Sequence, residues 1–182
     1  DIAVISLGGI VRSKNLHIAG DRMNNDIINY VRDEFRVLIG ERTAESVKIA
    51  IGSAIKGSEP MEAVIRGRDL VTGLPREVIV TDTDIREAIG SSVIGLVEAV
   101  KEVIETTPPE VLSDVMSRGI VLSGGGALLR GLDELLAKEV GVPVYVANDP
   151  LTAVARGAGI VLENMEEYKE VLIEHENDLP PQ

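Results

Sequence analysis

A run of three consecutive glycines, Gly124–Gly126, most constrains what this chain can fold into. It lies in GIVLSGGGALLRGL, residues 119–132, between an apolar strand-like stretch and a helix-like stretch. At a strand-to-helix turn without side chains, another molecule can approach the backbone closely, and the N–H groups favour anions such as phosphate. The alternative interpretation is a tight turn that only requires positive φ, because the run matches neither common glycine-rich phosphate motif.

The composition is that of a globular chain without disulfides. Its 182 residues are 45% hydrophobic and include no cysteine. No apolar run approaches the ~20 residues of a membrane span. The net charge of −12 argues against non-specific nucleic-acid binding, which depends on cationic side chains. Half of this charge lies in residues 163–182, which we expect to form a fraying acidic helix that ends in disorder.

The periodicity of apolar residues predicts hairpins and helices along the chain. A turn at Gly8-Gly9 joins the first two strands, and Asp21 caps the next helix. A long helix opens with a capping box formed by Asp84 and Glu87. The other expected elements are a helix from Thr43, a hairpin at 61–81, a helix from Pro109 to Arg118, a helix at 129–140, a strand at 143–147 and a helix from 148.

These elements favour an α/β fold with two parts. Strands alternate with helices in the second half of the chain, whereas residues 22–92 combine helices with one hairpin. We therefore predict one α/β unit made of residues 1–21 and 93–182, with an inserted α+β subdomain at residues 22–92. The junction Ala19-Gly20-Asp21 is expected to lie at the hinge. Because the chain starts at Asp1 in a strand-like stretch, we also expect it to be part of a longer protein.

The reactive side chains exclude several kinds of active site. No Cys/His pair or zinc cluster can form, because the chain has no cysteine and only two histidines, His17 and His175. Both histidines are expected at the surface. No GxSxG motif is present, so covalent hydrolysis is not expected. We therefore assign no catalytic residue and no metal ligand.

A second candidate site lies in GERTAESVK, residues 40–48. On a helix, Glu45 and Lys48 are three residues apart and project from one face. The alternative interpretation is a solvent-exposed ion pair worth less than ~1 kcal/mol. Combined with the glycine run, the pair suits a nucleotide held in a cleft, with charged groups for the ribose and bare backbone for the base.

Several segments, taken in order, resemble the C-terminal half of the MreB family of bacterial actin homologues. They are DIAVISLGGIV, IAGDRMNNDIINYVR, IGERTAESVKIAIG, GRDLVTGLP, TPPEVLSDVMSRGIVLSGGGALLRGLD and PLTAVARGAG, between residue 1 and about residue 162. The resemblance implies the second lobe of the actin-like ATPase fold, which is of the ribonuclease H-like class. Residues 1–21 and 93–182 then correspond to subdomain IIA, and residues 22–92 to the inserted subdomain IIB.

The resemblance also implies a nucleotide site, with ATP as the cofactor and Mg²⁺ in the intact protein. It places four residues on the helix that contacts adenosine, Glu45, Ser46, Val47 and Lys48, and four in the loop under the nucleotide, Ser123, Gly124, Gly125 and Gly126. Ser123 stands where many relatives have Thr. The family's phosphate loops would precede Asp1. The intact protein is therefore implied to be a weak ATPase, and this chain alone is expected to be inactive.

The function implied by the resemblance is that of a filament-forming cytoskeletal protein that organises cell-wall elongation and rod cell shape. The implied partners are further copies in paired head-to-tail protofilaments, membrane-bound cell-shape and cell-wall elongation proteins, and the cytoplasmic membrane through another part of the protein. No nucleic-acid partner is expected. The expected location is the cytoplasm, at the inner face of the cell membrane.

Two alternatives from other functional classes remain open. A phosphotransferase of the same superfamily needs a sugar-binding acid, for which the sequence offers no candidate. A stand-alone protein-interaction module of the same fold would carry only a vestigial nucleotide site.

Overall fold

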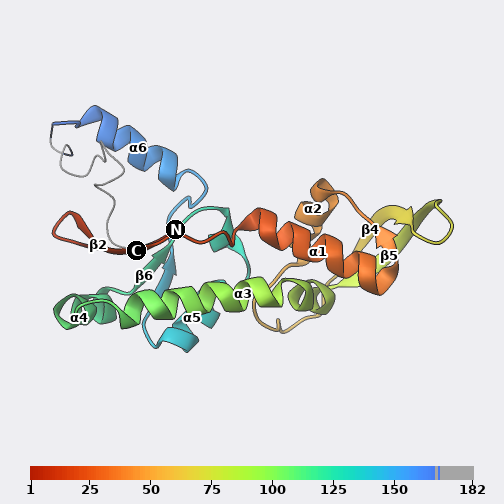
Figure 1. Cartoon of the computed structure of the whole chain (residues 1–182), viewed down its shortest axis with the longest axis horizontal. Coiled ribbons are helices and arrows are strands. Elements are labelled where there is room, and N and C mark those ends of the chain that lie inside the picture. The colour runs from red at the N-terminus through yellow and green to blue at the C-terminus, as the bar shows by residue number, and fades with distance from the viewer. Residues whose placement is uncertain (167, 169–182) are drawn as a thin grey trace. The chain divides into compact units, whose positions relative to one another are not determined.

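The chain divides into two compact units (Figure 1). A computed structural model describes residues 1–166 and 168. Unit 1 comprises Asp1–Leu16, Val97–Leu128 and Leu136–Gln182, and unit 2 comprises His17–Leu96 and Leu129–Leu135. The segment Leu129–Leu135 thus groups with unit 2, although the sequence division placed it with residues 93–182. Most of the predicted acidic tail, including His175, lies outside the described residues.

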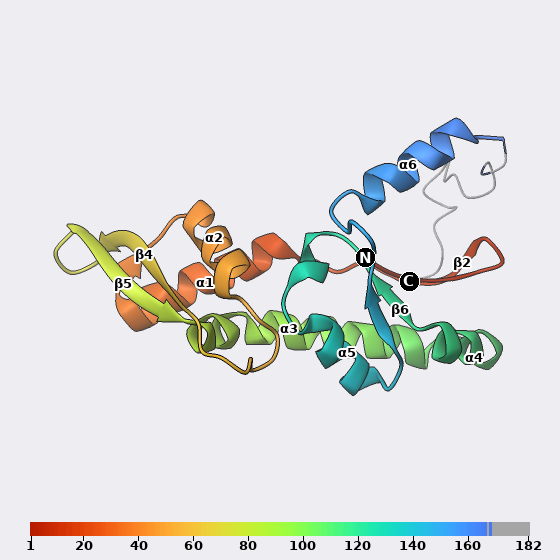
Figure 2. The ribbon, with the colours of Figure 1, turned by 180° about the vertical axis from the view of Figure 1, so that it is seen from behind.

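Unit 2 contains a three-stranded antiparallel sheet with helices packed against it. Strand β4 (Glu62–Asp69) lies between β3 (Val37–Leu38) and β5 (Pro75–Thr81). Its helices are α1 (Gly20–Phe35), α2 (Glu41–Ile51) and the first part of α3 (Asp82–Glu105). Helix α1 contacts α2 and β3, and α2 contacts β4. Figure 2 shows α1, α2 and β4 from behind. The predicted hairpin at 61–81 is therefore confirmed, as β4 and β5.

The core of unit 2 follows the predicted apolar periodicity. Helix α2 buries Ala44, Val47 and Ile51, which recur at helical spacing along one face. Alternate residues of β5, Val78 and Val80, point into the same core. Other buried apolar side chains of this unit are Met23, Ile27, Val31, Val37, Ile39, Ile65, Ile85, Ile89, Val93, Leu129 and Leu132. Burying each large apolar side chain stabilises the fold by ~1.5–3 kcal/mol.

The predicted N-terminal caps of two helices are wrong. Ala19 is the N-cap of α1, and Asp21 lies in its first turn, where its charge complements the helix dipole. The reciprocal cap of α3 joins Thr81 and Asp84: the Asp84 carboxylate accepts from the Thr81 N–H at 2.7 Å, and the Thr81 hydroxyl accepts from the Asp84 N–H at 3.2 Å. Thr81-x-x-Asp84 matches the capping pattern as well as Asp84-x-x-Glu87 does, so sequence spacing did not distinguish them.

Unit 1 contains a hairpin, a parallel strand pair and several helices. Strand β1 (Ile2–Ser6) pairs with β2 (Gly9–Lys14), and the turn is Leu7-Gly8, one residue before the predicted position. Strand β6 (Ile120–Leu122) pairs in parallel with β7 (Val144–Val146). The other elements are the rest of α3, α4 (Pro109–Arg118), the 3₁₀ helix η1 (Gly125–Leu128), the end of α5 (Leu132–Val140) and α6 (Ala153–Glu163). Helix α4 has its predicted bounds, whereas α5 and α6 start later than expected.

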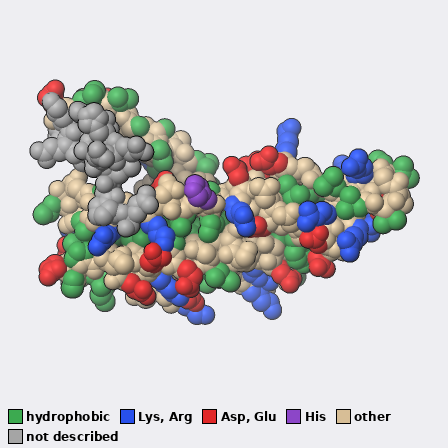
Figure 3. All heavy atoms as spheres, in the orientation of Figure 1, with side chains coloured by type: hydrophobic (Ala, Val, Ile, Leu, Met, Phe, Trp, Pro, Cys, Tyr) green, Lys and Arg blue, Asp and Glu red, His purple; other side chains and the backbone are tan. Residues whose placement is uncertain are grey.

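Unit 1 leaves many of its apolar side chains exposed. Helix α6 has no buried residue, and Leu7 at the tip of the first hairpin is fully exposed. Figure 3 shows apolar side chains interspersed with acidic and basic ones on the face that it draws. Apolar surface of this kind is available for packing against another molecule or another part of a protein. Among the described residues, no helix has both the length and the hydropathy required to cross a membrane.

A buried carboxylate organises the β4–β5 turn of unit 2. The Asp69 side chain accepts hydrogen bonds from the N–H groups of Thr72 and Val71, each at 2.8 Å. The guanidinium of Arg76 donates to its other oxygen at 3.0 Å. These interactions lower the pKa of Asp69 from its usual 3.8 to about 2, with the Thr72 N–H contributing most.

We expect the charge of Asp69 to stabilise this turn at neutral pH. Because its folded-state pKa is depressed, this contribution is present above the usual 3.8 and is lost as the pH falls towards 2. Asp69→Asn keeps an oxygen that can accept from the N–H groups but removes the charge. The variant should therefore have a lower Tm at pH 7, and its Tm should decline less between pH 4 and pH 2 than that of the wild type. Parallel Tm profiles against pH would contradict this account.

Candidate functional site

The helix-borne part of the candidate site lies on α2 in unit 2. Glu45 and Ser46 are exposed, and the Ser46 hydroxyl donates to the Arg42 carbonyl at 2.8 Å. Val47 is only 3% exposed and belongs to the core, so its side chain can influence a ligand only by positioning the helix. Glu45 and Lys48 are therefore the residues of this group with charged side chains available near the surface.

Lys48 is half-buried and is held by backbone. Its ammonium donates to the carbonyl of Gly20 at 3.0 Å, in the junction that was expected to be a hinge. Burial lowers the pKa of Lys48, while the charges of Glu45 and Asp21 oppose that shift. The described residues contain no ion pair between Glu45 and Lys48, so the alternative of a simple surface salt bridge does not explain the pair.

The loop-borne part, Ser123–Gly126, lies in unit 1 between β6 and η1. Gly124 has φ +80°, a conformation that side-chain-bearing residues rarely adopt, and its N–H donates to the Pro150 carbonyl at 2.8 Å. Gly124 is thus the glycine that the turn itself requires. The interpretation of the run as a tight turn with positive φ accounts for this residue alone.

The next two glycines are not explained by the packing of the described residues. A Cβ on Gly126 would have nothing within 4 Å, and a Cβ on Gly125 would make only an ordinary 3.6 Å contact with Leu151. Neither residue has positive φ, and both lie in η1. Close approach by a molecule from outside the chain is a physical reason for glycine at such positions.

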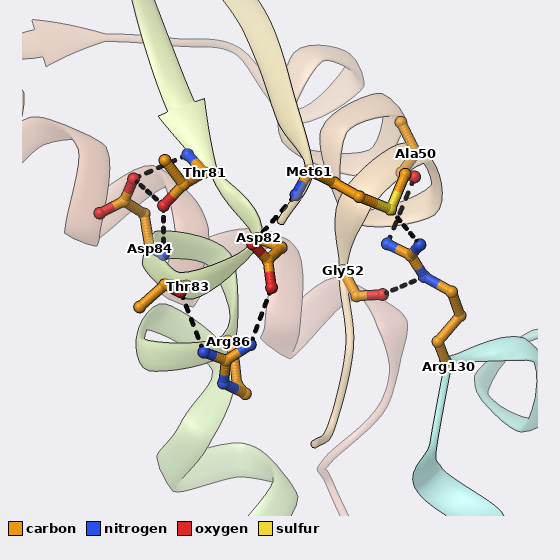
Figure 4. A network of polar contacts seen from close by, with 9 residues as sticks. All are labelled: Ala50, Gly52, Met61, Thr81, Asp82, Thr83, Asp84, Arg86 and Arg130. Atoms are coloured by element: carbon orange, nitrogen blue, oxygen red, sulfur yellow. Dashed lines mark hydrogen bonds and ion pairs between the residues drawn. The ribbon is translucent and has the colours of Figure 1, made fainter. Parts of the chain in front are cut away.

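A third group of polar residues in unit 2 was not found from the sequence. Arg130 donates to the backbone carbonyl of Gly52 at 3.1 Å and contacts the sulfur of Met61 (Figure 4). A cavity of about 310 Å³ lies beside these residues and is lined in part by Arg130, Met61, Lys56 and Ser53. The Ser53 hydroxyl is buried without a hydrogen-bond partner. No local pattern predicted this group, because Arg130 and Gly52 are 78 residues apart.

The described residues include no group of three or more acidic, histidine or cysteine side chains placed to hold a metal ion. The charged and polar groups of the candidate site are the Glu45 carboxylate, the Lys48 ammonium and the backbone of the loop. Such groups can bind the hydroxyl groups and phosphates of a ligand. The two parts of the candidate site lie in different units.

The model of the family described as MreB/Mbl protein matches residues 1–170. The chain belongs to the MreB/Mbl family. Its similarity to curated members is high: it is 49% identical over 166 residues to the cell shape-determining protein Mbl of Bacillus subtilis, covering 91% of this chain and 50% of that protein. It is 52% identical over 163 residues to the cell shape-determining protein MreB of Escherichia coli, covering 90% and 47% respectively.

A solved family structure supports the actin-like fold. MreB5 of Spiroplasma citri bound to ADP superposes with a TM-score of 0.87 at 37% identity, covering 92% of this chain and 51% of that one. The same protein bound to AMPPNP gives a TM-score of 0.86. The fold class expected from the resemblance is thus confirmed. The chain spans about half the length of the curated relatives it matches.

Gly124 and Gly126 lead to different expectations for substitution by alanine. Gly124→Ala places a side chain at φ +80° and should destabilise the fold by ~1–2 kcal/mol. We expect a loss in Tm of about 2–4 °C for each kcal/mol in a protein of this size. Gly126→Ala meets open space and should leave the Tm unchanged. Thermal unfolding of both variants tests this difference, and an equal loss of Tm would contradict it.

Proposed function

We propose that this chain is part of an ATP-binding, filament-forming cytoskeletal protein that organises cell-wall elongation and rod cell shape. The observation that carries the proposal is the close match to MreB5, which has been solved with ADP and with AMPPNP. The names of the curated relatives, which describe cell shape-determining proteins, support the cellular role. The chain's own residues support a nucleotide ligand, because Gly125 and Gly126 leave the loop open to close approach.

In this proposal, α2 and the glycine loop bind different parts of ATP. The exposed Glu45 carboxylate accepts hydrogen bonds from ribose hydroxyls, and the Lys48 ammonium contributes positive charge beside it. The loop Ser123–Gly126 lies under the nucleotide, where the backbone N–H groups of Gly125 and Gly126 at the start of η1 can donate to oxygen atoms, because the Gly124 N–H is already donated to Pro150. Mg²⁺ accompanies ATP and supplies charge neutralisation at the phosphates when bound.

Hydrolysis requires groups around the γ-phosphate in addition to those that bind adenosine. We propose that these groups come from another part of the full-length protein, because the site residues assigned to this chain serve the adenosine side. The prediction that the chain alone does not hydrolyse ATP follows from this division of roles. A phosphate-release assay on the purified chain tests it, and Mg²⁺-dependent turnover would contradict it.

We further propose that the protein assembles head to tail into paired protofilaments at the inner face of the cytoplasmic membrane. Head-to-tail contacts generate open polymers. In this proposal, the full-length protein contacts the membrane and binds membrane-bound elongation proteins. One surface suited to assembly is the β4–β5 turn, where Leu70, Val71 and Leu74 are 44%, 83% and 65% exposed. Asp69 holds this turn in one conformation, so its apolar side chains are presented without a large ordering cost.

Glu45→Gln is the substitution that tests the nucleotide site most directly. It keeps the size of an exposed side chain and removes its charge. The amide keeps one accepting oxygen but replaces the other with an NH2 donor, so one of the hydrogen bonds from the ribose hydroxyls is lost. Loss of a hydrogen bond to a charged group costs ~1.5–3 kcal/mol, so we expect at least about tenfold weaker binding of a fluorescent ATP analogue to the full-length protein. Glu34→Gln, which changes an exposed carboxylate on α1, is the matched control and should bind as the wild type does. Equal affinity of Glu45→Gln and wild type would contradict the assignment.

Val71→Asp tests the assembly surface. The substitution places a charge among the exposed apolar side chains of the turn and should not disturb the core, because Val71 is 83% exposed. We expect the full-length variant to bind nucleotide normally but to sediment less in a polymerisation assay with ATP. Unchanged sedimentation would show that this turn is not an assembly contact.

A further inference from the structure

Arg130 ties the segment after the glycine loop to the end of α2. Its Nε donates to the carbonyl of Gly52 at 3.1 Å, and a terminal nitrogen lies 3.5 Å from the carbonyl of Ala50. The other terminal nitrogen contacts the sulfur of Met61 (Figure 4). One guanidinium therefore reaches the last turn of α2, its C-cap residue and the residue that precedes β4.

The backbone of the same segment is fixed as well. The N–H of Ala54 donates to the Arg130 carbonyl at 2.8 Å, and Ser53 and Arg130 form a parallel bridge. The next residue, Gly131, has φ +71°, and a Cβ there would lie 2.3 Å from the Ile55 side chain. The chain therefore fits closely against residues 52–55 at this point, by backbone and by side chain.

The third partner of Arg130 is itself held in place. Met61 donates its N–H to the buried carboxylate of Asp82 at 3.2 Å, and the N–H of Asp82 donates to the Met61 carbonyl at 2.8 Å. Arg86 donates to the second oxygen of Asp82 at 3.0 Å, and Asp82 is only 7% exposed. Figure 4 shows these contacts joined through Met61. Arg130 therefore binds a preformed group of acceptors rather than a mobile loop.

The position of this contact in the chain matters. Gly52 follows Lys48 by four residues, and Arg130 follows Gly126 by four residues. The Arg130–Gly52 hydrogen bond therefore joins two residues that each lie shortly after a candidate nucleotide segment in the sequence. Without this hydrogen bond, the segment around Arg130 would be joined to the end of α2 by fewer hydrogen bonds.

We propose that Arg130 is a positioning residue for the nucleotide, acting by fixing the C-terminal end of α2 through its contacts with Ala50, Gly52 and Met61. The inference rests on the proposed binding of ATP. Arg130 has no assigned contact with the nucleotide; it lowers the ordering cost of binding by holding the end of α2, the helix that carries Glu45 and Lys48, before the ligand arrives.

The test uses the full-length protein that contains this chain. Arg130→Gln removes the charge and the forked donors, and Arg130→Lys keeps the charge but not the fork. Arg68→Gln is the control, because Arg68 is exposed on β4 and makes no side-chain hydrogen bond among the described residues. For each variant, the Kd and the dissociation rate of a fluorescent ATP analogue are measured with MgCl₂ at a temperature well below the Tm.

We expect Arg130→Gln to bind about tenfold more weakly with faster dissociation, Arg130→Lys to be intermediate, and Arg68→Gln to match the wild type. A purely stabilising role would lower the Tm but leave the Kd of the folded protein unchanged, and that result would overturn the inference. If the wild type itself does not bind the analogue, the proposed function fails, which is a distinguishable outcome.

A second measurement keeps the inference testable if Arg130→Gln does not fold. In the wild-type full-length protein, hydrogen exchange of the segment that contains Ala54 is followed with and without ATP. The Ala54 N–H donates to Arg130, so positioning by this residue predicts slower exchange when ATP is bound. Unchanged exchange of this segment, under conditions where ATP is bound, would contradict the proposal.

Discussion

Burial of the apolar face of α2 decides which side chains of unit 2 can meet a ligand. Ala44, Val47 and Ile51 lie in the core, and α2 contacts both α1 and β4. Because successive residues on a helix are rotated by about 100°, this packing leaves Glu45 exposed and Lys48 at the edge of the core. The same interaction that stabilises the unit therefore orients the charged groups of the candidate site. Because Val47 is buried, it can take part in nucleotide binding only indirectly, by positioning α2.

The sequence predicts the order and type of most elements because apolar periodicity and chain breakers are local signals. The β4–β5 hairpin and helix α4, which starts at Pro109, agree with the prediction from these local signals. Element ends were predicted less well, since several residues could serve the same purpose. Thr81 rather than Glu87 completes the cap with Asp84, and the first turn is centred on Leu7 and Gly8 rather than on two glycines. Several neighbouring residues are compatible with a cap or a turn at such element ends. Tertiary packing determines which of these residues forms it.

The candidate site shows the same limit more sharply. The glycine run and the Glu45–Lys48 pair could be recognised because each is contiguous or at helical spacing. The Arg130 contacts could not, because their partners are backbone carbonyls, which every residue has. The distinction among the three glycines also required coordinates. Only Gly124 has the positive φ that a turn explains, and only the structure shows that a side chain on Gly126 would meet open space.

Lys48 links the proposed ligand contact to the start of α1. A lysine ammonium has three donors, and the Gly20 carbonyl takes one of them, so a ligand can bind Lys48 without breaking that hydrogen bond. Replacing Lys48 would remove both interactions at once, because the same nitrogen makes them. Glu45 is exposed and makes no side-chain hydrogen bond or ion pair among the described residues, and its charge acts on the protein only through the nearby Lys48. A change in nucleotide affinity on substitution of Glu45 can therefore be attributed to the ligand contact, whereas the same change at Lys48 would also reflect the lost contact with Gly20.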